Sequence, residues 1–165
     1  MKNLFTIISL FLFAQGTLSA QTFFDAVNHA FSLAATGGFS TRNLSVGYYD
    51  SDLINLVVMI FMAVCAMHFG LVYAVFVTRS FKPMNNTVVK YYFGSIAVCS
   101  IIVAFSLMSE GGYSHWGRAL MDSSFTVISY MSTCGFGICD NSAWPWIAGI
   151  VLLFVSFQCG CSGST

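Results

Sequence analysis

Charged residues interrupt an otherwise apolar chain at intervals, and the uncharged stretches between them have two characteristic lengths. The longer stretches cover residues 3–24, 53–78, 91–109 and 141–165. A helix needs about 20 mostly apolar residues to cross a bilayer, so each long stretch is predicted to span the membrane. Two shorter stretches, 26–41 and 123–139, contain glycine and many Ser or Thr residues. They are predicted to be re-entrant segments.

Composition places the chain among membrane proteins. Hydrophobic residues make up 57% of it and charged residues 7%, whereas soluble domains carry roughly 25% charged residues. Six basic and six acidic residues balance, so the chain has no basic face for nucleic acid. The predicted fold class is an all-α polytopic membrane protein that contacts lipid and binds no nucleic acid.

The six cysteines lie mostly inside the apolar stretches, where a thiol behaves as a small hydrophobic group. A disulfide framework is therefore not expected. A zinc site is not expected either, because the spacing of Cys134, Cys139, Cys159 and Cys161 matches no known zinc knuckle or ribbon. No cofactor and no resident metal are predicted.

The first 20 residues allow two interpretations. Lys2, the apolar residues 4–14 and the pair Ser19-Ala20 imitate a secretory signal peptide. A shortened spanning helix is the preferred interpretation, because the next segment, 26–41, is itself predicted to lie within the membrane.

Basic residues in short loops predict the orientation. Arg79, Lys82 and Lys90 cluster between the second and third predicted spans without a nearby acid, which is typical of a cytoplasmic loop. Three connections then lie outside: 42–52, 110–118 and 140–146. Both re-entrant segments are therefore predicted to enter the membrane from its outer face.

An internal repeat is found when Gly38 is aligned with Gly135. The alignment also pairs Asp25 with Asp122, Ser32 with Ser129, Thr36 with Thr133 and Phe39 with Phe136. Two pore repeats are predicted, 1–80 and 81–165, each ordered as spanning helix, short helix, Thr-x-Gly-Phe and spanning helix. Parallel repeats are related by an axis along the membrane normal, so their equivalent loops are expected to converge on a central pore.

The repeated loops carry the candidate chemistry. Each follows a short helix that is expected to begin near Asp25 or Asp122, where an acid is favourable. An extended Thr-x-Gly stretch can turn its carbonyl oxygens toward the axis, and a ring of such oxygens replaces the hydration shell of potassium. Glycine permits the left-handed backbone that this requires. The predicted ion-binding groups are the backbone carbonyls of Thr36, Gly37, Gly38, Thr133, Cys134 and Gly135. The Cys134 thiol is expected to pack behind the loop.

Three segments carry a resemblance to a known family: Ala-Thr-Gly-Gly-Phe-Ser-Thr at 35–41, Ser-Thr-Cys-Gly-Phe at 132–136 and Gly-Cys-Ser-Gly-Ser-Thr at 160–165. The chain resembles the Trk, Ktr and HKT superfamily of potassium and sodium transporters, most closely bacterial Trk-type potassium-uptake subunits. Family members carry four pore repeats, and by order this chain looks like the second and third. Two repeats supply half of a four-part ring, so the chain is expected to be a fragment; otherwise two copies of it must associate.

The resemblance also implies features that the residues alone do not show. It implies a filter glycine in each repeat, here Gly38 and Gly135, and a gating loop formed by Gly160, Cys161, Ser162 and Gly163. It implies potassium uptake by a multi-pass protein of the cell inner or plasma membrane. It further implies a homodimer of full-length chains and a cytoplasmic nucleotide-binding regulatory subunit.

Two other functions compete with potassium uptake: another kind of polytopic transporter, and an intramembrane serine protease. In the protease, Ser162 would be the nucleophile and His68, in the second predicted span, its base. Nothing in the sequence brings these two residues together, and the repeat would be unexplained. His68 is instead expected to pack between helices. Arg42 and Asp140 follow the two loops, where an exposed charge is expected to have little effect on ion entry.

Overall fold

The computed structural model describes residues 23–67, 73, 75, 77, 86–110, 113 and 115–158. All regular elements within these residues are helical, which confirms the all-α prediction. They are α2 (Phe23–Ala34), the 3₁₀ helix η1 (Ser45–Tyr49), α3 (Asp52–Cys65), α5 (Thr87–Ser109), α6 (Trp116–Met131) and α7 (Trp146–Gln158). The expected gating loop, His68 and the first 22 residues lie outside the described part.

Helix α5 has the length and composition of a membrane span. Its 23 residues extend about 35 Å at the α-helical rise, which exceeds the hydrocarbon core of a typical bilayer. It begins four residues before the uncharged stretch, so Lys90 lies in its first turn, where a long side chain can reach the membrane surface. Over the described residues, α3 and α7 are shorter apolar helices.

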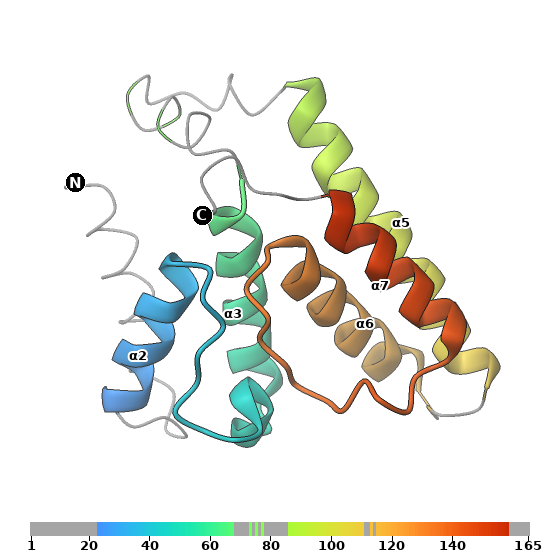
Figure 1. Cartoon of the computed structure of the whole chain (residues 1–165), viewed down its shortest axis with the longest axis horizontal. Coiled ribbons are helices and arrows are strands. Elements are labelled where there is room, and N and C mark those ends of the chain that lie inside the picture. Colours follow the sequence, from blue (N-terminus) through green and yellow to red (C-terminus); the bar gives the residue numbers. More distant parts are fainter. Residues whose placement is uncertain are drawn as a thin grey trace.

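The two short helices run in the same direction and are each followed by an irregular segment that turns back (Figure 1). This arrangement is the one expected of re-entrant segments. Asp25 lies in the first turn of α2. The prediction that the second short helix begins near Asp122 is wrong, because α6 begins at Trp116. Residues before Asp122 extend the helix, and among them Ala119 is fully buried.

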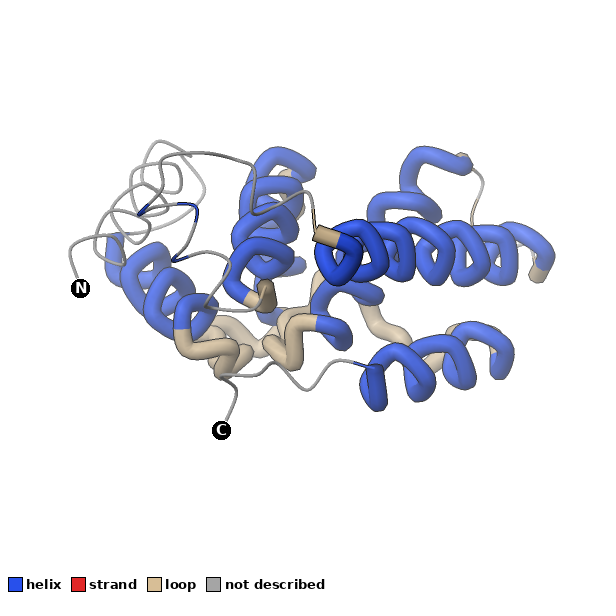
Figure 2. The backbone as a smooth tube through the Cα atoms, turned by 90° about the horizontal axis from the view of Figure 1, so that it is seen from above, coloured by secondary structure: helices blue, strands red, loops and turns tan. Residues whose placement is uncertain are grey.

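Helix α6 lies at the centre of the packing and contacts α3, α5 and α7, as Figures 1 and 2 show from two directions. Its side chains Phe125 and Val127 are fully buried. Val103 of α5 and Val155 of α7 are also fully buried. A short central helix enclosed by apolar neighbours is suited to hold the loop that follows it.

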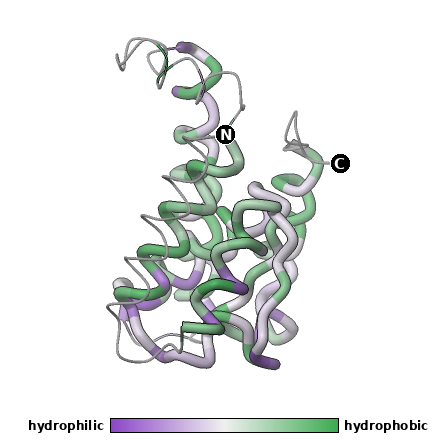
Figure 3. Tube along the Cα trace, turned by 90° about the vertical axis from the view of Figure 1, so that its left-hand side faces the viewer, coloured by the Kyte–Doolittle hydropathy of each residue, from purple (hydrophilic) through white to green (hydrophobic). Residues whose placement is uncertain are grey.

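Large apolar side chains are exposed on several helices, while a few ionisable side chains are buried beside the apolar core. Phe105 of α5 is 65% exposed and Phe157 of α7 is 82% exposed, whereas Asp25, His29 and Asp122 are at most 3% exposed. Hydrophobic colouring runs along the helices in Figure 3. Apolar outer faces, with ionisable groups kept inside the protein, are what a lipid environment favours.

Candidate functional site

The two Thr-x-Gly-Phe loops, Thr36–Phe39 and Thr133–Phe136, adjoin in space. A Cβ atom placed on Gly38 would overlap the carbonyl oxygen of Cys134 and lie 3.4 Å from the carbonyl carbon of Gly135. Gly38 and Cys134, 96 positions apart in the sequence, are therefore in direct backbone contact, as expected of loops that converge on one axis.

The loops share an unusual backbone conformation. Thr36 and Gly38 have φ values of 50° and 67°, and Thr133 and Gly135 have 56° and 76°. Gly37 and Cys134, which lie between these left-handed residues, have no positive φ. The sequence predicted a left-handed backbone at the glycines but not at the threonines. A β-branched residue rarely adopts this conformation, so finding it at both equivalent positions marks a strained and repeated feature.

Hydrogen bonds at the helix ends explain why the threonines are left-handed. Beyond α2, the amide of Thr36 donates to the carbonyl of Leu33 at 3.0 Å and that of Gly37 to Ser32 at 2.7 Å. This is a Schellman ending, whose left-handed position is usually taken by glycine. Thr133 closes α6 with the corresponding bond to Tyr130 at 3.2 Å.

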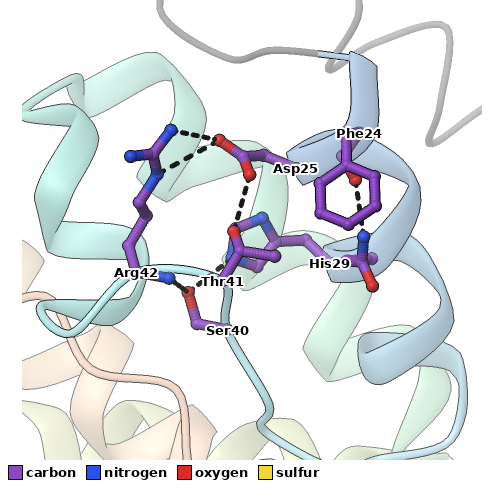
Figure 4. A network of polar contacts seen from close by, with 7 residues as sticks. Phe24, Asp25, His29, Ser40, Thr41 and Arg42 are labelled. Carbon is purple, nitrogen blue, oxygen red and sulfur yellow. Dashed lines mark hydrogen bonds and ion pairs between the residues drawn. The ribbon is translucent and has the colours of Figure 1, made fainter.

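A buried carboxylate anchors the residues that follow the first loop to its helix (Figure 4). Asp25 accepts hydrogen bonds from Thr41 Oγ1 at 2.7 Å and from Arg42 Nε and Nη2 at 3.2 and 3.0 Å. The hydrogen bond to Asp25 raises the pKa of Arg42. Arg42 is therefore not an isolated loop charge, because it pairs with a carboxylate that is only 5% exposed. Asp25 thus holds the loop and does more than start the helix.

His29 links the same loop to the second repeat. Its Nε2 lies 2.8 Å from Ser40 Oγ, and its ring lies 5.8 Å from the rings of both Tyr49 and Phe136. The side chain is 1% exposed. The sequence gives no signal for His29, since Thr126 occupies the equivalent position in the second repeat.

The second loop is anchored differently, because Cys139 stands where the first repeat has Arg42. Asp122 instead accepts a hydrogen bond from Tyr113 at 2.9 Å and pairs with Arg118 of its own helix at 3.3 Å. Arg118 also contacts Asp52 at the start of α3 at 3.1 Å. Burial, followed by the charge of Asp122, raises the pKa of Cys139 to about 11.

Two further contacts hold the second loop on opposite sides. Ser129 of α6 donates its hydroxyl to the carbonyl of Phe136 at 2.6 Å. The next residue, Gly137, bonds with Ser45 and Gly47 of the first repeat. Asp140 is farther along the chain, and its bond with Ser142 lowers the pKa of the Asp140 carboxyl.

The six predicted ion-binding residues therefore gather in two adjoining loops. The Cys134 side chain is 2% exposed. The described residues contain no group of three or more His, Cys, Asp or Glu side chains placed to hold a metal ion. Gly160, Cys161, Ser162 and Gly163 lie beyond the described part of the chain, as does His68.

Comparisons with known proteins place this architecture. The chain is similar to the Trk system potassium uptake protein TrkH of Vibrio parahaemolyticus, 36% identical over 157 residues that cover 90% of this chain and 31% of that protein. The TrkH of Escherichia coli K12 is 32% identical, over 86% of this chain and 30% of that protein. The TrkG of the same strain is 34% identical, with 90% and 30% covered. The chain thus spans about a third of the length of these relatives.

The crystal structure of the potassium transporter TrkH from Vibrio parahaemolyticus matches with a TM-score of 0.84 at 28% identity, covering 93% of this chain and 33% of that one. The family model TrkH, described as a cation transport protein, matches residues 3–107 of this chain. These findings confirm the resemblance and do not favour the serine-protease alternative. The chain belongs to the TrkH family of cation transport proteins.

Proposed function

We propose that the two loops form part of a selectivity filter through which potassium is taken up across the cell inner or plasma membrane. The observation that carries the proposal is the backbone conformation that the two loops share. Each is left-handed at the Thr and at the Gly of Thr-x-Gly-Phe, and the loops meet at Gly38 and Cys134. Left-handed residues on both sides of one loop residue let the backbone depart from helix and strand, so that carbonyl oxygens can turn toward a common axis. Carbonyl oxygens arranged in this way replace the water that potassium loses.

The helices behind the loops contribute favourable charge. The C-terminal end of an α-helix carries about half a negative charge, and the loops begin where α2 and α6 end. Both helix ends therefore attract a cation to the place where the loops meet. The strained threonines support a functional role, since such conformations persist at sites where the surrounding structure enforces them.

Two loops are half of a four-part ring. We assign them to two pore repeats, 1–80 and 81–165, of a multi-pass protein whose remaining repeats come from a longer polypeptide. By the same resemblance, Gly160, Cys161, Ser162 and Gly163 form a gating loop below the filter. The full-length protein is proposed to act as a homodimer with a cytoplasmic nucleotide-binding regulatory subunit.

Uptake of rubidium and sodium by cells that lack other potassium-uptake systems tests the proposal. In the full-length protein, Gly38→Ser and Gly135→Ser should reduce rubidium uptake or relax the preference over sodium, while membrane levels on blots stay near normal. Ser162→Ala should change uptake far less. Unchanged uptake in both glycine variants, with uptake lost only in Ser162→Ala, would contradict the proposed filter and favour the serine protease.

A further inference from the structure

The turn that follows the first loop holds the backbone of the second. The amide of Gly47, in η1, donates to the carbonyl of Gly137 at 3.1 Å. The amide of Gly137 in turn donates to Ser45 Oγ at 3.3 Å. Both backbone groups of Gly137 are therefore bonded to the other repeat, two residues after Gly135.

The approach of the two segments leaves no room for a side chain at Gly47. A Cβ atom there would lie 2.5 Å from the carbonyl oxygen of Ile138 and 2.9 Å from its carbonyl carbon. These are backbone atoms, which cannot turn aside as a flexible side chain does. Any side chain at Gly47 must therefore push the segment that continues from the second loop.

The turn is itself firmly held. Ser45 has a left-handed φ of 54°, and the next residue, Val46, is fully buried. Tyr49, at the end of η1, is 7% exposed and packs edge-on against His29. His29 also contacts Phe136 of the second loop. A strained residue persists only when its surroundings enforce it, so the packing of Val46 and Tyr49 holds this turn in place.

We infer that Ser45 and Gly47 are positioning residues that set the carbonyls of the second loop for ion selectivity. They fix Gly137 from one side while Ser129 fixes Phe136 from the other. The inference rests on the proposed filter. The second repeat keeps a serine, Ser142, at the position equivalent to Ser45 but has Trp144 at the position equivalent to Gly47, so the glycine of this turn is not repeated there.

Three variants of the full-length protein test the inference. Ser45→Gly removes the hydroxyl that Gly137 contacts, while glycine suits the left-handed backbone. If Ser45 acted only through its backbone conformation, this variant would keep the wild-type ion preference. Gly47→Ala adds the obstructing Cβ. Gly149→Ala in α7 is the control, because a Cβ there has no neighbour within 4 Å among the described residues. The readout is the ratio of rubidium to sodium uptake, which does not depend on the amount of protein.

We expect Ser45→Gly and Gly47→Ala to lower that ratio about 2- to 10-fold, as the loss of one intramolecular hydrogen bond would, and Gly149→Ala to keep it. If Gly47→Ala does not reach the membrane, Ser45→Gly decides alone. A wild-type ratio in Ser45→Gly, alongside an altered ratio in Gly38→Ser, would overturn the positioning role and leave the filter standing. A wild-type ratio in Gly38→Ser as well would overturn both.

Discussion

Gly38 and its neighbour Gly37 offer a sharp comparison within one loop. Gly38 has a left-handed φ of 67°, and a Cβ on it would overlap the carbonyl oxygen of Cys134. A Cβ on Gly37 would meet no atom closer than 3.3 Å, and that atom belongs to the movable Phe39 ring. The position equivalent to Gly37 already carries the side chain of Cys134. Gly38→Ala should therefore be far more harmful than Gly37→Ala.

The expected magnitude follows from two costs. An alanine held in the left-handed conformation costs about 1 to 2 kcal/mol. The Cys134 carbonyl must also move away until a contact of about 3.5 Å is restored. If the strain falls on the ion-occupied filter, 1 to 2 kcal/mol changes the preference for potassium over sodium by about 5- to 30-fold.

Competition of sodium with rubidium uptake measures this preference in the full-length protein. Gly37→Ala should shift it much less than Gly38→Ala, and Gly149→Ala should leave it unchanged. An equal shift in the two loop variants would show that close backbone contact and left-handed φ do not determine the effect. A wild-type preference in Gly38→Ala would show that the backbone at Gly38 does not set ion selectivity.

Three further predictions concern the surroundings of the loops. Arg42→Gln and Asp25→Asn should each lower the thermal unfolding temperature in detergent, and the double variant should lose less than the sum, because the two residues form one pair; additive losses would contradict this. At pH 8, Cys139 should react with maleimide roughly a hundredfold more slowly than in the denatured chain, because its pKa is raised from 9.0 to about 11 and only the thiolate reacts. Site-resolved mass spectrometry measures the two reaction rates. Equal rates would show that the Cys139 thiol is not buried as described. A reporter fused near Met84 should be cytoplasmic and one near Tyr48 external, and the opposite result would invert the topology.

Much of the architecture could be predicted from the sequence because it depends on local patterns. Uncharged stretches predicted the apolar helices, and the recurrence of Thr-x-Gly-Phe predicted two equivalent loops. The start of α6 was misplaced because Arg118 was read as part of an outer connection. In the structure Arg118 lies one helical turn before Asp122 and pairs with it, so the charge belongs to the helix.

The supports of the loops could not be predicted, because they depend on contacts between distant residues. Gly47 is 90 residues from Gly137, and no local pattern indicates that their backbones meet. His29 has no counterpart in the second repeat, so the alignment passed over it. The left-handed threonines follow from how each helix ends, whereas residue preferences predict glycine there.

Under the proposed function, backbone carbonyls of the two loops bind the transported ion. Anomalous scattering from crystals of the full-length protein grown with rubidium would locate that ion. We predict peaks where the loops Thr36–Gly38 and Thr133–Gly135 face the axis, at distances typical of coordination by carbonyl oxygens. Peaks confined to other parts of the protein, with none between these loops, would contradict the claim.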